Sequence, residues 1–196
     1  MNNKQQGMTL VELMVTLAVV AILASVAAPS LSSMMENNRL TAINNQLFSA
    51  IFYTRSEAIK RSFPVTMCAK AADNTCATAA DAAAGAGFED GWIIFVDCNP
   101  DEVIDTTNVC DFDGNGTAEA PETILSEDVP SGMSSLTVRP DTAGSTLGRA
   151  IRYLPNGNTS FSGTLNLRRN DENVYLVKIK PITGRASSCK VGNTGC

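Results

Sequence analysis

The feature that most constrains this chain is an uncharged stretch near its beginning, residues 13–28, which directly follows Glu12. Thr16 and Ser25 are the only polar residues in this stretch. As a helix, such a run is long enough to occupy most of a bilayer core about 30 Å thick. A charge buried in hydrocarbon costs at least about 2.5 kcal/mol. The position of Glu12 therefore predicts a partner of opposite charge.

A secretory signal peptide is the ordinary alternative for such a segment. Lys4 would supply its positive charge, and Ala27-Ala28 would supply the small residues before a cleavage site. Two residues argue against this interpretation. Pro29 would directly follow the cut, and Glu12 interrupts the region where the apolar core should begin.

A resemblance to a known class of proteins is carried by the residues Gly7-Met8-Thr9-Leu10-Val11-Glu12. They resemble the leader junction of type IV pilins and type II secretion pseudopilins, whose usual pattern is Gly-Phe-Thr-Leu-x-Glu. The resemblance implies that a membrane aspartyl peptidase, the prepilin peptidase, cuts after Gly7 and methylates the new first residue, Met8. It also implies that residues 1–7 are a leader peptide, and that Glu12 pairs with the N-terminal ammonium of a neighbouring subunit in a filament.

Composition argues against catalysis. The chain has no histidine, which removes the commonest general base and transition-metal ligand. No nucleophile–base pair, phosphate-binding glycine loop or carboxylate dyad is evident, so we do not predict an enzyme. The net charge of -5 is unevenly distributed. Residues 71–148 contain 15 acidic residues and one basic residue, whereas residues 149–196 contain eight basic and two acidic residues.

Six cysteines in a chain with an exported N-terminus predict disulfides. Fifteen connectivities are possible in principle. We favour local pairing, because the cysteines fall into three close pairs and each disulfide would then close one loop: Cys68/Cys76, Cys98/Cys110 and Cys189/Cys196. A zinc site is the rival interpretation, but no Cys-x-x-Cys occurs and the spacings are irregular. The oxidising periplasm fits better.

A long helix is predicted from Met8 to Arg61, with Phe63-Pro64 as its end. Residues 8–30 would be its transmembrane or filament-core half, and residues 31–62 an amphipathic half packed on a domain formed by residues 63–196. Pro29 should kink or loosen it. Spacings of three and four define one apolar stripe on the second half: Leu40, Ile43, Leu47, Ile51, Thr54 and Ala58. A membrane anchor followed by a separate helix is the alternative.

After the helix the hydrophobic period changes to that of strands. Turn sequences separate the candidates, which are Val65–Cys68, Gly91–Asp97, Thr123–Ser126, Met133–Arg139, Ala150–Leu154, Thr164–Arg168 and Val174–Ile182. One long helix followed by short strands predicts an α+β fold, with the helix packed on an antiparallel β-sheet domain.

Several segments in this order also resemble GspH/FimT-type minor pilins and pseudopilins. They are Ser56-Glu57-Ala58, Gly91–Asp97, Glu122–Leu125, Tyr153–Gly157 and Thr183-Gly184-Arg185. The resemblance implies a minor pilin that aids assembly of a type IV pilus and contacts other pilins through its N-terminal helix. It implies a single-pass inner-membrane protein with a periplasmic C-terminal domain, which is then assembled into a surface pilus. A type II secretion pseudopilin of the GspH type is the alternative.

An acidic segment has the spacing of a calcium-binding loop. Asp111, Asp113 and Asn115 precede Gly116, and Glu122 lies eleven residues after Asp111. These are the oxygen-ligand positions 1, 3, 5 and 12 of an EF-hand, with glycine at position 6. The flanks are predicted strands rather than helices, which favours a solvated hairpin tip and no cofactor. Calcium binding stays open as the second interpretation.

The C-terminal end of the chain is basic, and its candidate DNA-binding residues are Arg168, Lys178, Lys180, Arg185 and Lys190. Alternation in Val177–Lys180 places both lysines on one face of a strand. We expect a flexible tail at residues 184–188 to extend this surface. Double-stranded DNA is the partner that such a patch fits, through salt-dependent phosphate contacts. Some FimT-type minor pilins bind DNA through Gly-Arg-x-Arg; Gly184-Arg185-Ala186-Ser187 keeps only the first arginine. A solvated strand face that pairs with acidic residues is the alternative.

Overall fold

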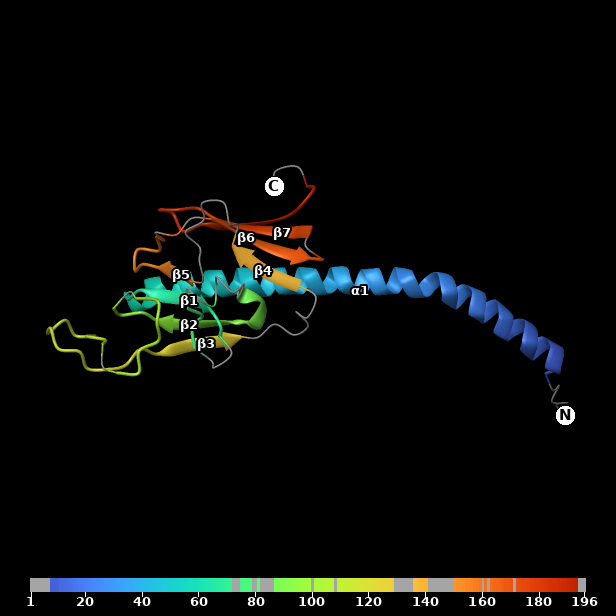
Figure 1. The fold of residues 1–196 in the computed structure, drawn as a ribbon, viewed down its shortest axis with the longest axis horizontal. Helices are drawn as coiled ribbons and strands as arrows, with labels where there is room; N and C mark the ends of the chain where they lie inside the picture. Colours follow the sequence, from blue (N-terminus) through green and yellow to red (C-terminus); the bar gives the residue numbers. More distant parts are fainter. Residues whose placement is uncertain are drawn as a thin grey trace, which may run out of the picture. The chain divides into compact units, whose positions relative to one another are not determined.

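The computed structural model describes residues 8–71, 75–78, 81, 87–99, 101–107, 109–128, 136–140, 150–159, 161, 163–170 and 172–193. Its first element is a single helix, α1, Leu10–Arg61, and Figure 1 shows it as one continuous element. The backbone stays helical across Pro29. The helix ends where Ser62 adopts a left-handed conformation with φ 60°. The continuous helix is confirmed, and the separate-helix alternative is wrong.

The chain forms two compact units, residues 1–42 and 43–196. In the first unit, the large apolar side chains between Leu10 and Leu23 are 50–73% exposed. A helix that is apolar on all sides is normally buried in its working environment. Over the described residues, none of the helices meets the length and apolarity that crossing a membrane requires.

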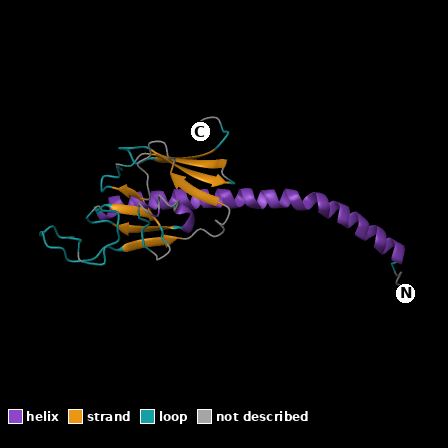
Figure 2. Cartoon of the chain, in the orientation of Figure 1, coloured by secondary structure: helices purple, strands orange, loops and turns teal. Residues whose placement is uncertain are grey.

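The second unit contains two antiparallel sheets of four strands each, drawn in orange in Figure 2. The first sheet has the order β3-β2-β1-β5. Its strands are β1 (Val65–Ala69), β2 (Trp92–Val96), β3 (Ile124–Asp128) and β5 (Ala150–Tyr153). A short 3-10 helix, η1 (Phe88–Asp90), precedes β2. All residues of β1 and β2 are buried, because these are the two central strands of the sheet.

The second sheet has the order β4-β6-β7-β8. Its strands are β4 (Leu136–Pro140), β6 (Gly163–Arg169), β7 (Glu172–Ile179) and β8 (Ala186–Lys190). Alternate residues on its inner face are buried, namely Leu165, Leu167, Val177 and Ile179. This face lies against the C-terminal part of α1, since Ser188 Oγ donates to Asn44 Oδ1 at 2.7 Å. The expected flexible tail at residues 184–188 is therefore wrong in its second half, which begins β8.

The core of residues 43–196 includes the predicted stripe of α1. Ile43, Leu47, Ile51, Thr54 and Ala58 are each no more than 2% exposed. The one polar member of the stripe is satisfied within the helix, because Thr54 Oγ1 donates to the carbonyl oxygen of Ala50 at 2.8 Å. Within the second unit, the helix thus buries this apolar stripe in the core, as its spacing predicts.

Disulfides close two loops of the first sheet. Cys68 pairs with Cys76, and Cys98 pairs with Cys110. The first disulfide lies in a buried cluster with Ile93, and both pairs confirm the local connectivity. Cys189 is also disulfide-bonded. Its predicted partner, Cys196, lies outside the described residues.

Candidate functional site

The N-terminal motif forms a capping box at the first turn of α1. Thr9 precedes the helix, and its Oγ1 accepts a hydrogen bond from Glu12 N–H at 3.3 Å. In return, a carboxylate oxygen of Glu12 accepts bonds from the backbone N–H of Thr9 at 3.3 Å and from its hydroxyl at 3.4 Å. This reciprocal pair is the usual role of the Thr-x-x-Glu spacing. The sequence contains this pattern, but Glu12 beside the apolar stretch predicted only an intermolecular ion pair.

The processing residues lie at an exposed helix end. Met8 is 69% exposed and Glu12 is exposed, whereas Gly7 lies outside the described residues. Cleavage after Gly7 and methylation of Met8 stay predictions. The structure adds that Glu12 has no cationic partner within the described part of the chain.

Three basic side chains converge where β7 leads into β8. Lys178 pairs with Ser187 across the ladder. The pairing continues past both strands, because Lys180 N–H donates to the carbonyl oxygen of Arg185 at 3.0 Å. Directly opposed residues share a face, and alternate residues along a strand share a face. Lys178, Lys180 and Arg185 therefore lie together on the outer face; we call these three residues and the intervening residues 181–184 the cationic turn.

None of the three basic side chains pairs with a carboxylate in the part of the chain that the structure describes. Lys180 and Arg185 are exposed, and Lys178 is half-buried. Their positive charge is consequently available to a partner. The sequence predicted the shared face of the two lysines, but it did not predict that Arg185 would join them.

The other two candidate DNA-binding residues lie elsewhere on the sheet. Lys190 is opposite Tyr175, whose side chain shares the inner face with Val177. Arg168 is opposite Asn173, five residues along β7 from Lys178. At about 3.3 Å per residue this is a separation of roughly 16 Å. The predicted five-residue patch is thus reduced to the three cations of the cationic turn.

A buried tyrosine of the first sheet forms a hydrogen bond with the cationic turn. Tyr153 Oη donates to the carbonyl oxygen of Gly184 at 2.9 Å. Gly184 has φ +59°, and a Cβ at this position would lie 2.5 Å from the carbonyl oxygen of Gly157 and 2.7 Å from Tyr153 Cε1. Burial raises the pKa of Tyr153 to about 12, so its hydroxyl remains a donor at physiological pH. Sequence reasoning singled out both segments but missed their contact.

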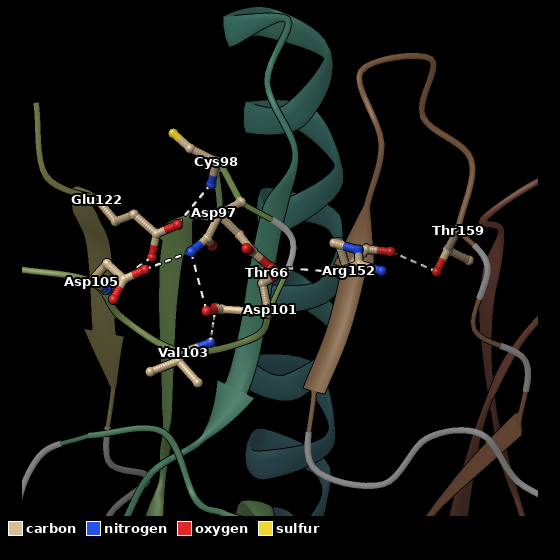
Figure 3. A network of polar contacts seen from close by, with 10 residues as sticks. Thr66, Asp97, Cys98, Asp101, Val103, Asp105, Glu122, Arg152 and Thr159 are labelled. Carbon is tan, nitrogen blue, oxygen red and sulfur yellow. Dashed lines mark hydrogen bonds and ion pairs between the residues drawn. The ribbon is translucent and has the colours of Figure 1, made fainter. Parts of the chain in front are cut away.

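The acidic segment 98–122 is held at its base by a buried carboxylate, Glu122. Its two oxygens accept hydrogen bonds from the N–H of Cys98 at 2.7 Å and from the N–H of Asp105 at 3.1 Å. Figure 3 shows Glu122 reaching toward both. Burial raises the pKa of the Glu122 carboxyl above its ordinary value, although these two N–H donors act in the opposite direction.

The tip of the same segment is organised around Asp111. Its carboxylate accepts hydrogen bonds from the backbone N–H groups of Gly114, Asn115 and Gly116. These bonds, that of Gly116 foremost, lower the pKa of Asp111 below its ordinary value. The side chain of Glu122 is committed to Cys98 and Asp105 instead, so it does not supply the twelfth-position ligand.

No group of three or more acidic or cysteine side chains among the described residues is arranged to hold a metal ion. The calcium set Asp111, Asp113, Asn115 and Glu122 is therefore not assembled in this structure, and calcium binding stays a prediction without support from Glu122.

A second buried carboxylate, Asp97, directly follows β2. Its side chain is fully buried and accepts a hydrogen bond from the hydroxyl of Thr66. Arg152 Nη1 lies 3.9 Å from the same oxygen, and Figure 3 shows the two residues approaching from opposite sides of β1, which carries Thr66. Burial raises the pKa of the Asp97 carboxyl, against the effects of Thr66 and Arg152. This network braces the sheet where the acidic segment begins, and it offers no arrangement of a nucleophile and a base.

Residues 44–183 match the family model described as Type II transport protein GspH. The chain belongs to the GspH family. Residues 2–28 of this GspH-family chain also match the prokaryotic N-terminal methylation motif. The two matches confirm the pilin-like class predicted from the leader junction and from the order of the later segments.

Solved structures include two similar chains. Both are crystal structures of the type IV minor pilin FimU of Pseudomonas aeruginosa, strain PAO1, in space groups P21 and P65. The first is 18% identical, with a TM-score of 0.48, over 78% of this chain and 89% of that chain. The second is 16% identical, with a TM-score of 0.46, over 76% of this chain and 91% of that chain. A search of curated proteins found no match for the GspH-family chain.

Proposed function

We propose that this GspH-family chain is a minor pilin of a type IV pilus. The observation that carries the proposal is the N-terminal methylation motif followed by a helix that is apolar on all sides. Prepilin peptidase would cut after Gly7 and methylate Met8. The chain would cross the inner membrane once, with residues 63–196 in the periplasm, and would then enter the filament by packing its helix among those of other pilins. The work is structural rather than catalytic.

Glu12 gives this assembly its physical basis. In a filament its carboxylate would meet the N-terminal ammonium of a neighbouring subunit within an apolar core. Removing one partner of a buried ion pair leaves the other charge uncompensated, at a cost of about 3–5 kcal/mol. A subunit without Glu12 would therefore be excluded from the filament.

A pseudopilin of a type II secretion system is the second candidate, since the matching family model is described as a type II transport protein. Deleting the gene distinguishes the two. For a minor pilin, we expect fewer surface pili in the sheared fraction, with export of secreted proteins unchanged. Loss of export with normal piliation would instead support the pseudopilin.

The cationic turn supports a further part of the proposal, contact with double-stranded DNA during uptake. We expect the full-length protein, in a nonionic detergent, to bind double-stranded DNA with an affinity that falls as salt rises. The double variant Lys178→Ala/Arg185→Ala should weaken binding and reduce the slope of log K against log salt by about 1 for each lost phosphate contact. Lys190→Ala is the matched control, because Lys190 lies on the other face of the sheet. An equal effect of the control would contradict a localised contact.

A further inference from the structure

The cationic turn carries a large apolar side chain at its tip. Ile182 is 73% exposed, the highest value among the large apolar side chains described for residues 43–196. Single exposed apolar residues are common on protein surfaces and need no special account. Ile182 differs from the other exposed apolar residues in its backbone conformation.

Ile182 is the central residue of a strained turn. Thr183 N–H donates to the carbonyl oxygen of Pro181 at 2.7 Å, and Ile182 has φ 67°. A bond from residue i+2 back to residue i around a central residue of positive φ is the γ-turn of the rare, strained class. A β-branched residue at positive φ is an outlier, whereas Gly and, to a lesser degree, Asn adopt positive φ more readily. Such strain clusters at functional sites, so this outlier points to a role for the Ile182 side chain.

The tip is fixed on both sides. Ile182 N–H donates to the carbonyl oxygen of Thr159 at 3.1 Å, and Gly184 N–H donates to the carbonyl oxygen of Lys180 at 3.1 Å. The Tyr153 hydroxyl holds Gly184 from the first sheet. The exposed side chain is consequently presented on a pre-ordered loop, which lowers the entropy lost when a partner binds.

Positive charge flanks this apolar side chain. Lys180 and Arg185 are exposed on either side of it, and the sequence has no acidic residue from Val174 to Cys196. Proteins that bind the DNA minor groove combine cations on the phosphates with an apolar side chain, isoleucine included, pressed against the base steps. A membrane surface is a poorer fit, because binding to it scales with buried apolar area and one isoleucine offers little.

We infer that Ile182 is an apolar wedge of the DNA contact, inserted at the minor groove while Lys180 and Arg185 bind the phosphates beside it. This inference rests on the proposed DNA contact. It adds to that contact a residue whose contribution to affinity does not depend on charge. A wedge and a cation differ in their salt dependence, since only the cation releases counterions. The two contributions can therefore be measured separately.

The test compares Ile182→Asn with wild type, using the full-length protein in nonionic detergent and a short double-stranded DNA. Asparagine adopts positive φ more readily than a β-branched residue, so we expect the Tm to stay at or above that of wild type. The affinity for DNA should nonetheless fall about tenfold, because the variant no longer buries an apolar side chain of this size in the complex. The salt slope should be unchanged. Ile124→Asn, at an isoleucine of β3 that is 47% exposed, is the control and should leave affinity unchanged.

The outcomes separate the wedge from the DNA contact itself. If wild type does not bind DNA even at low salt, the proposed contact fails. If wild type binds and Ile182→Asn binds equally well, the wedge is overturned and the cationic contact stands. A lower Tm for Ile182→Asn would assign Ile182 a structural role.

Discussion

Replacing Glu12 by Ala is expected to lower the amount of this subunit in sheared filaments by about a hundredfold or more, the factor that corresponds to an uncompensated buried ammonium. The other pilins stay wild type, so the filament still forms and only the incorporation of the variant changes. The measurement is an immunoblot of the sheared fraction, normalised to the same protein in membranes. Equal membrane levels would show that the loss arises at assembly.

Thr9→Ala is the control that the structure supplies. The Thr9 hydroxyl is half of the capping box, so its removal weakens the same helix end while the carboxylate of Glu12 remains. Losing a cap costs about 1 kcal/mol, which a long helix tolerates. Incorporation should stay near wild type. A defect of Thr9→Ala as severe as that of Glu12→Ala would instead assign Glu12 the role of a helix cap alone.

Gly184→Ala is expected to destabilise the second unit by about 3–5 kcal/mol, because left-handed strain adds to overpacking. A Cβ would lie 2.5 Å from the carbonyl oxygen of Gly157, which is backbone and cannot rotate away. For a domain of this size, the Tm should fall by about 10–15 °C. Trp92 is the single tryptophan and is 1% exposed, so its fluorescence reports the unfolding of this unit in the full-length protein.

Gly192→Ala is the matched control for this prediction. Gly192 has a similarly positive φ of +92°, but a Cβ there would meet nothing within 4 Å. Its cost should be the backbone strain alone, about 1–2 kcal/mol. If the two variants lose equal stability, the close approach of Gly184 to Tyr153 and Gly157 contributes nothing.

Most of the fold could be predicted from local patterns. The stripe from Ile43 to Ala58 has helical spacing, and β2 is a run of β-branched and aromatic residues, so both elements could be predicted. β8 could not be predicted, because its sequence Ala-Ser-Ser-Cys-Lys has little strand preference. Its conformation comes from pairing with β7, a tertiary effect that no window of sequence contains.

The candidate site divides in the same way. Alternation along β7 predicted that Lys178 and Lys180 share a face, because the period of a strand is a local property. The addition of Arg185 required the register between two strands, which the sequence does not contain. Spacing misled in one case. Glu122 stands at the twelfth position of a calcium loop, yet its oxygens accept hydrogen bonds from the N–H groups of Cys98 and Asp105.

The capping box of α1 has a consequence for the order of events in the proposed filament. Before assembly, the carboxylate of Glu12 accepts hydrogen bonds from the N–H and hydroxyl of Thr9 at 3.3 and 3.4 Å, which are longer than usual and therefore weak. In a free subunit, the Glu12 carboxylate is thus oriented at the end of the helix but held only by weak hydrogen bonds. The N-terminal ammonium of a neighbouring subunit then has only to replace these weak hydrogen bonds, so docking needs no rearrangement of the helix.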